Sequence, residues 1–281
     1  MKKLFSIVIC VMTLLFSGCE ENAPATSSKV DPSDPPSNLA AKPFSVSSSK
    51  QVYFSRGNLQ YHPANNKWRF AENQTDYIGE DNGNYSSAYN GWLDLFGWST
   101  NATNFGVNTS TSNSDYLGSF VDWGTNQIGS DAPNTWRTLT NSEWSYVVFK
   151  RSSASSLRGI AQVNGVNGLI LLPDNWICPG GVIFKSGFYN SNGYYDNYSA
   201  YQTFTADQWL NLEKSGAVFL PAAGYRRGSN VSGVQDNGYY WSATECERYG
   251  AYGFYFRSGE AYVEGVSDCS VWHSVRLVKD L

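Results

Sequence analysis

Few side chains in this 281-residue sequence are of the types that carry out catalysis or hold metal ions. The two histidines, His62 and His273, stand far apart in the sequence and lack the spacing of metal ligands. His62 falls in a predicted turn and His273 next to the last predicted strand, so both are interpreted as structural. No Walker loop, zinc pattern or serine–histidine–aspartate order is present. The sequence therefore predicts no catalytic site, no metal site and no cofactor.

Three cysteines lie in the region expected to fold: Cys178, Cys246 and Cys269. Cys246 and Cys269 flank a predicted hairpin almost symmetrically. One interpretation is a disulfide, which would stabilise the protein by roughly 3 kcal/mol in the chain-entropy model. The other interpretation is two free thiols. The sequence leaves both open.

Carboxylates are spread through the predicted loops, where oxygen ligands for a structural Ca²⁺ are usually found. They are Asp81, Asp94, Asp115, Asp122 and Asp236. Solvated loop carboxylates are the simpler interpretation, and a calcium site stays an open alternative.

The strongest candidate for recognition is the outward face of the last predicted hairpin. Apolar and polar residues alternate from Tyr252 to Arg257 and again, after a turn at Ser258–Gly259, from Glu260 to Glu264. A period of two places one set, Tyr252, Phe254, Phe256, Ala261 and Val263, inward and the other set outward. Tyr, Trp and Arg are enriched at binding hot spots. The candidate ligand-binding residues are Arg248, Tyr249, Tyr255, Arg257, Glu260, Tyr262, Glu264 and Trp272.

The elements that position this hairpin are short strands and two helices. Thr140 with Glu143, and Thr205 with Gln208, form capping boxes, which predict helices over 141–151 and from 206 to about Gly216. Alternation or continuous apolar character predicts strands, and little regular structure is expected over 79–129. The predicted strands are 51–55, 58–62, 67–71, 168–173, 217–221 and 274–278.

The N-terminus has the pattern of an export signal. Lys2-Lys3 precedes an apolar run from Leu4 to Phe16, which is too short to span a membrane. The following Leu-Phe-Ser-Gly-Cys19 resembles a bacterial lipobox, which implies cleavage before Cys19 and its acylation with chains such as palmitate. An ordinary secretory signal is the alternative. Residues 22–42 are rich in Pro, Ser and Asp and lack apolar periodicity, as is typical of a flexible tether.

These observations divide the chain into a signal peptide (1–18), an acylated cysteine with a tether (19–43) and one folded domain (44–281). Glu20-Glu21 resembles the surface-export signal of Bacteroidota lipoproteins, which implies an outer-membrane anchor facing the cell exterior. Net charge is −4, so the electrostatic footprint expected of a nucleic-acid-binding protein is missing.

Several segments of the domain resemble known families. Trp136-Arg-Thr-Leu-Thr-Asn-Ser-Glu-Trp144 is similar to a segment of the formylglycine-generating-enzyme branch of the C-type-lectin-like fold. Residues 220–226, 238–245 and 273–280 resemble the Fibrobacter succinogenes major paralogous domain and its relatives in gut Bacteroidota. The resemblance implies an α+β, C-type-lectin-like domain with two helices packed on small antiparallel sheets and long ordered loops. It does not imply catalysis, because the flanking segments that accompany the reactive cysteines of the enzyme are absent.

Asparagine is distributed unevenly in a way that resembles retroelement-diversified variable proteins. There are 24 Asn between Asn38 and Asn237 and none from Gly238 to Leu281, where about five would be expected at the same density. In such proteins, asparagine codons of a template are the commonest mutated positions. Glu260 and Trp272 do not follow from the usual Asn codon, so the resemblance is partial, and ordinary drift on an exposed hairpin is the alternative.

The sequence therefore predicts a lipid-anchored surface protein that binds a ligand as an adhesin and is not an enzyme. Its partner is expected to be a glycan or a surface protein of a host, a bacterium or a phage. A structural or fimbrial-accessory subunit is the alternative.

Overall fold

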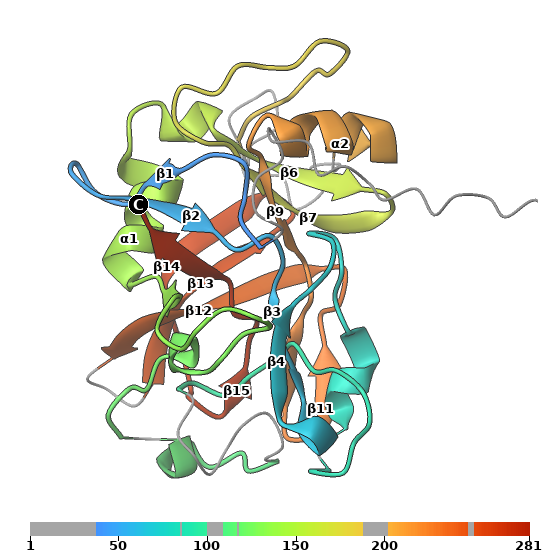
Figure 1. Cartoon of the computed structure of the whole chain (residues 1–281), viewed down its shortest axis with the longest axis vertical. Coiled ribbons are helices and arrows are strands. Elements are labelled where there is room, and N and C mark those ends of the chain that lie inside the picture. Colours follow the sequence, from blue (N-terminus) through green and yellow to red (C-terminus); the bar gives the residue numbers. More distant parts are fainter. Residues whose placement is uncertain (1–37, 85, 100–108, 117, 188–201, 247–249) are drawn as a thin grey trace, which may run out of the picture. The chain divides into compact units, whose positions relative to one another are not determined.

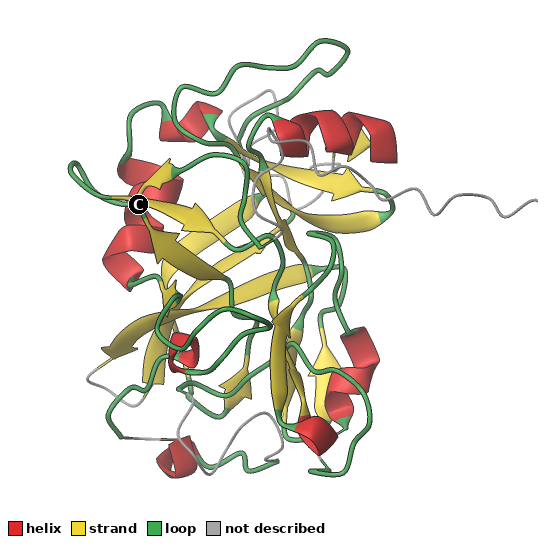
Figure 2. Cartoon of the chain, in the orientation of Figure 1, coloured by secondary structure: helices red, strands yellow, loops and turns green. Residues whose placement is uncertain are grey.

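The computed structural model describes residues 38–84, 86–99, 109–116, 118–187, 202–246 and 250–281, with the side chain of Glu264 left out. Within these residues the protein is α+β and consists mostly of strands, arranged in five small sheets (Figures 1 and 2). The α+β prediction is confirmed at this level. Among the described residues, no helix is long and apolar enough to cross a membrane.

One sheet joins the two ends of the folded domain. Its order is β1 (Phe44–Ser45), β2 (Gln51–Phe54), β16 (Leu277–Asp280) and β5 (Arg137–Thr138), and every pair is antiparallel. Leu39 already bridges Ser55, and Ala40 is buried, so the chain packs slightly before the predicted boundary at Phe44. Cys19 and nearly all of the predicted tether lie outside the described residues.

Three further sheets support the core. A hairpin consists of β3 (Leu59–His62) and β4 (Lys67–Phe70). A four-stranded sheet has the order β8 (Gln202–Phe204), β6 (Arg158–Val163), β7 (Val166–Leu171) and β9 (Val218–Pro221). A three-stranded sheet has the order β11 (Asn230–Ser232), β10 (Tyr225–Arg227) and β15 (Val271–Trp272).

Both predicted helices form, and both begin with the predicted capping box. Helix α1 (Asn141–Ser145) continues as the π-helical turn η5 (Tyr146–Lys150), and α2 spans Ala206–Lys214. Trp144, Val147 and Val148 are buried, because their spacing places them on one face of the helix. The remaining helical turns are 3₁₀: η1 (Pro63–Asn65), η2 (Gly79–Gly83), η3 (Asn113–Tyr116), η4 (Trp123–Thr125) and η6 (Ala154–Ser156).

The fifth sheet is the one that carries the candidate site. It is a meander of β12 (Asn237–Cys246), β13 (Gly250–Arg257) and β14 (Glu260–Ser267). The predicted turn at Ser258–Gly259 joins β13 to β14, and Phe254, Phe256 and Val263 point into the core as predicted. One face of the sheet thus packs against α1, where the rings of Phe254 and Trp144 stack with their centroids 5.1 Å apart.

The three described cysteines are free thiols, so the disulfide interpretation is wrong for this structure. The reason is the order of the strands. Cys246 ends β12 and pairs with Gly250 of β13, whereas Cys269 follows β14 on the far side of β13. Two strand spacings correspond to about 9–10 Å, beyond the roughly 7 Å that a disulfide can bridge between Cα atoms.

The thiols should differ sharply in reactivity. Cys178 is exposed, whereas burial and the neighbouring Glu245 and Asp268 charges raise the pKa of Cys269 to about 12. Because the thiolate is the reactive form, we expect a thiol-specific reagent at pH 8 to label Cys178 quickly and Cys269 only after unfolding. Mass mapping of labelled peptides checks this, and rapid labelling of Cys269 in the folded protein would contradict it.

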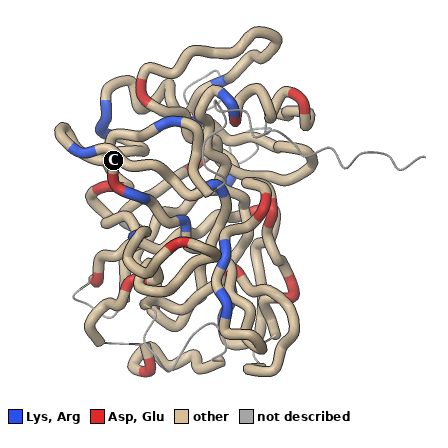
Figure 3. Tube along the Cα trace, viewed as in Figure 1, with Lys and Arg blue, Asp and Glu red and all other residues tan. Residues whose placement is uncertain are grey.

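Charged residues of both signs are interspersed along the described chain (Figure 3). The most connected charged group is at the edge of the first sheet, where Arg137 contacts both Glu143 and Asp280 at 2.8 Å. These pairs hold the start of α1 beside the C-terminal strand.

Candidate functional site

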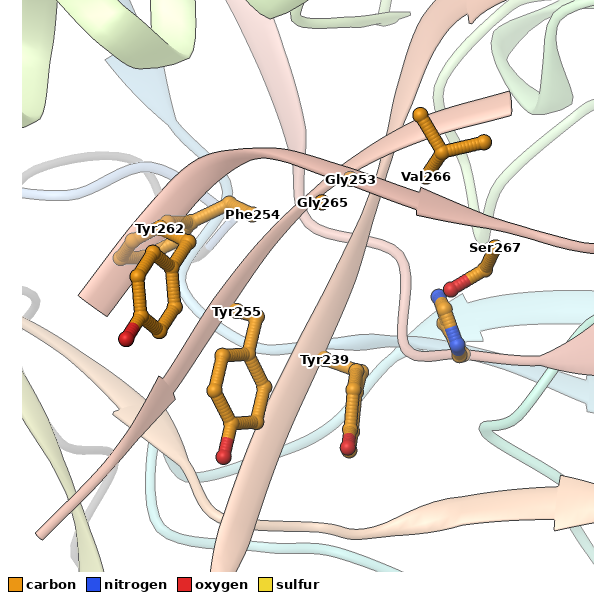
Figure 4. A pocket seen from close by; sticks show the side chains of 9 residues that line it. Tyr239, Gly253, Phe254, Tyr255, Tyr262, Gly265, Val266 and Ser267 are labelled. Carbon is orange, nitrogen blue, oxygen red and sulfur yellow. The ribbon is translucent and has the colours of Figure 1, made fainter. Parts of the chain in front are cut away.

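Three tyrosines form a row across the outer face of the β12–β13–β14 sheet. Tyr239 pairs with Tyr255, and Tyr255 pairs with Tyr262, so one residue from each strand stands side by side. The ring centroids are 4.7 and 5.9 Å apart. The three hydroxyl groups lie on the same side of the row (Figure 4). Such a row provides rigid aromatic contact area that also carries hydrogen-bonding groups.

A polar row borders the tyrosines on the side of their hydroxyls. It consists of Asn237, Arg257 and Glu260, which are cross-strand neighbours. The Tyr255 hydroxyl donates to Asn237 Oδ1 at 3.2 Å, the Tyr262 hydroxyl donates to Glu260 Oε2 at 2.7 Å, and Arg257 pairs with Glu260. Burial raises the pKa of Tyr255, so this hydroxyl stays protonated and remains a donor. This polar row, the rim of the site, therefore fixes the orientation of the Tyr255 and Tyr262 rings.

On the other side of the tyrosines the sheet is hollow, because two glycines face each other there. Gly253 of β13 pairs with Gly265 of β14. A β-bulge between Gly253 and Tyr255 adds a residue to β14, which brings Tyr262 and Gly265 to the same face although they are three positions apart. The resulting pocket has a volume of about 210 Å³. Its lining is Tyr239, Gly253, Phe254, Tyr255, Tyr262, Gly265, Val266, Ser267 and His273 (Figure 4).

His273 closes one end of this pocket. Its backbone N–H and C=O form hydrogen bonds with the backbone of Phe96. Its ring stacks between the rings of Trp241 and Tyr239, with centroid distances of 4.1 and 4.9 Å. The residue is only 1 % exposed, and neither ring nitrogen has a hydrogen-bond partner. Nδ1 lies 3.8 Å from the point where a Cβ on residue 253 would stand, so it borders the glycine floor of the pocket.

Burial also fixes the protonation state of this histidine. It lowers the pKa of His273 to about 3, so the ring is neutral at physiological pH. A neutral imidazole offers one donor and one acceptor. An unpaired buried polar group is unfavourable, and a ligand that supplies the missing partners would remove that cost.

The structure brings together four of the predicted binding residues: Tyr255, Arg257, Glu260 and Tyr262. Tyr262 is 47 % exposed, and the side chain of Arg257 is 49 % exposed. Their placement on one outer face agrees with the prediction from the alternation of residues along each strand. Their role in binding stays a prediction. Arg248 and Tyr249 lie outside the described residues, as does the side chain of Glu264.

The prediction for Trp272 is wrong. This residue is 0 % exposed and belongs to β15, which pairs with β10 in a different sheet. The Arg226 guanidinium covers its ring at 3.4 Å, and Tyr116 packs against it edge-on. Trp272 is therefore a core residue, because the chain leaves the sheet face after β14 and turns inward.

Sequence reasoning missed Tyr239, Gly253, Gly265 and His273 as members of the site. Tyr239 stands on a third strand whose partner was not predicted. The glycines have no side chain that alternation could flag, and His273 was interpreted as structural. The sequence contains only an indirect indication of these residues. Tyr239 and His273 lie in the segments 238–245 and 273–280, which resemble the known family.

Two of the loop carboxylates considered for calcium are occupied by protein donors. Asp94 accepts from the Ile78 amide at 2.9 Å and from Asn82 Nδ2 at 2.7 Å, and burial raises its pKa to about 6. Asp122 accepts from the Gly124 and Thr138 amides, both at 2.9 Å. In the described part of the chain, no group of three or more His, Cys, Asp or Glu side chains is placed to hold a metal ion.

Comparison with known proteins gives a match to a family model. Residues 196–278 match the model of a family described as a domain of unknown function, DUF8237, which covers under a third of the chain. The matched region contains the complete β12–β13–β14 sheet, and it includes His273. No curated protein and no solved structure matches the chain.

Proposed function

We propose that this protein is a surface-exposed lipoprotein that binds a ligand, as an adhesin, through the outer face of its β12–β13–β14 sheet. The observation that carries the proposal is the row of Tyr239, Tyr255 and Tyr262 beside an open pocket. Aromatic anchors within a polar rim are the usual composition of a recognition site. The region matched by the family model includes this whole sheet, so the match and the site coincide.

The proposed anchor is the acylated Cys19, which would hold the domain on the outer membrane facing the cell exterior. The ligand-binding role includes no catalysis, cofactor or nucleic acid. The partner is a glycan or a surface protein of a host, another bacterium or a phage. For the fold, we propose a C-type-lectin-like domain of the Fibrobacter succinogenes major paralogous type, supported by the two capped helices and by the pairing of β2 with β16.

We also propose that the face is a candidate for retroelement diversification. Tyr255, Arg257 and Tyr262 lie in the asparagine-free C-terminal segment and share one surface. A near-repeat of the last part of the gene beside a reverse transcriptase would support this. Its absence from the neighbouring DNA would favour ordinary drift.

The binding proposal is tested by screening the protein on glycan and surface-protein arrays. We expect a hit that is lost in a folded variant carrying Tyr255→Ala, Arg257→Ala and Tyr262→Ala, because the aromatic anchors and the rim charge are removed together. A matched control with Tyr53→Ala and Arg227→Ala, which lie in other sheets, should keep the hit. Retention of the hit by the triple variant would place the binding site elsewhere.

One observation favours the alternative of a structural or fimbrial-accessory subunit. In the described part of the chain, β14 is the outermost strand of its sheet, and an open strand edge can accept a strand from another protein. An array without hits, together with recovery of the protein in a high-mass surface polymer, would support assembly over ligand binding.

A further inference from the structure

We propose that the pocket over Gly253 and Gly265 binds a single neutral sugar ring, with His273 as the hydrogen-bonding group at its closed end. This inference rests on the proposed function of the sheet face and specifies its ligand. The argument has three parts, which concern the size, the charge and the unpaired polar atoms of the pocket.

The hollow has room for about one ring of a ligand. A volume of 210 Å³ corresponds to about seven water molecules at their share of liquid volume. Tyr255 and Tyr262 stand at one end and Ser267 at the other (Figure 4). A flat ligand group that rests on the glycine floor would contact the aromatic rings of the lining residues at its sides. The C–H surface of a pyranose can make such contacts.

The charge of the pocket favours a neutral ligand. None of the nine lining residues carries a formal charge at neutral pH, since His273 is uncharged. The closest rim charges, Arg257 and Glu260, are paired with each other. A carboxylate, phosphate or ammonium group would lose its hydration in this pocket without gaining a partner of opposite charge.

The unpaired nitrogens of His273 favour a sugar over an apolar peptide side chain. Nδ1 borders the floor of the pocket, 3.8 Å from the place of a Cβ on residue 253, and has no hydrogen-bond partner in the protein. A sugar hydroxyl both donates and accepts, so it pairs with a neutral imidazole in either tautomer. An aliphatic or phenyl side chain in the same position would leave the nitrogens unpaired and buried.

The test uses the full acylated chain in a detergent without a sugar head group. Neutral monosaccharides are screened singly by saturation-transfer NMR, and the dissociation constant of any binder is then measured by titration. Gly265→Leu fills the pocket without a backbone clash, because a Cβ there meets only the Gly253 carbonyl oxygen at 3.8 Å. His273→Phe keeps the stacked ring and removes both nitrogens. Matched controls are Gly180→Leu, where a Cβ meets nothing within 4 Å, and His62→Phe.

We expect at least one sugar to bind the wild type, with a dissociation constant raised at least tenfold by Gly265→Leu and by His273→Phe. The two controls should bind as the wild type does, and melting temperatures should confirm that all four variants fold. A sugar that binds equally to Gly265→Leu and His273→Phe would overturn the inference.

The failure of this inference is distinguishable from the failure of the proposed function. If no monosaccharide binds, but a protein on the array is still recognised and is lost in the Tyr255, Arg257 and Tyr262 triple variant, the face binds a protein and the sugar inference is wrong. If the array hit survives in the triple variant, the proposed function of the face is wrong.

Discussion

Acid should destabilise the wild-type protein much more than a His273→Phe variant. Burial lowers the folded-state pKa of His273 to about 3, against an ordinary value of 6.5. Between these values the unfolded chain binds a proton that the folded protein does not, so the free energy of unfolding falls as pH falls from 6.5 towards 3. A shift of this size corresponds to about 5 kcal/mol across the whole window, of which about 3 kcal/mol falls above pH 4. Phenylalanine cannot titrate and fills a similar space between Tyr239 and Trp241.

Urea unfolding from pH 7 to pH 4 measures this effect as the difference in unfolding free energy between the variant and the wild type. The other acidic groups contribute equally to both proteins, so they cancel in the difference. Tyr239→Phe is the matched control, because it alters the ring beside His273 without removing a group that titrates in this range. A variant whose pH profile runs parallel to that of the wild type would contradict the prediction, because His273 would then take up its proton at the same pH in the folded and the unfolded states.

Trp144→Ala should have the second largest effect, a loss of about 3–5 kcal/mol in unfolding free energy. Trp144 is fully buried and joins three parts of the fold. Its ring contacts Phe54 of β2 at 5.8 Å and stacks on Phe254 of β13 at 5.1 Å, and its indole N–H donates to the Trp241 carbonyl oxygen at 3.3 Å. Truncation leaves a cavity beneath the sheet that carries the candidate site.

The control for this substitution is Trp92→Ala. Trp92 is partly exposed, with the Arg69 guanidinium over its ring at 3.8 Å, so its removal should cost about 1 kcal/mol. Urea midpoints at pH 7 compare the two variants. Equal losses in both would mean that α1 does not hold the β12–β13–β14 sheet in place. Because the sheet rests on Trp144, we also expect Trp144→Ala to weaken any ligand binding by the face.

The sequence predicted correctly what is decided by neighbouring residues. The capping boxes at Thr140 and Thr205 pair groups three residues apart, so they specify where each helix begins whatever surrounds them. The alternation from Tyr252 to Glu264 and the turn at Ser258–Gly259 likewise depend on short-range backbone geometry. These patterns correctly predicted the hairpin and the inward direction of Phe254, Phe256 and Val263.

The tertiary structure alone decided which strands and loops meet the hairpin. Period two applies only within a strand, so it gave no information on Trp272, which the chain carries inward to pair with β10. Nor did it reveal that β12 would add Tyr239 to the row, since cross-strand partners are set by sheet order and register. The bulge that places Gly265 beside Gly253, and the strand spacing that separates Cys246 from Cys269, follow from the same pairing.

The candidate site therefore divides into two parts with different origins. The sequence by itself determined an outward set that includes Tyr255, Arg257 and Tyr262, because these residues alternate with core residues along continuous strands. The fold determined the pocket. His273 reaches it because its backbone is hydrogen-bonded to the backbone of Phe96, which is far from His273 in the sequence. A hollow floored by glycines and closed by a neutral histidine is a property of packed neighbours, and local patterns in a sequence do not encode it.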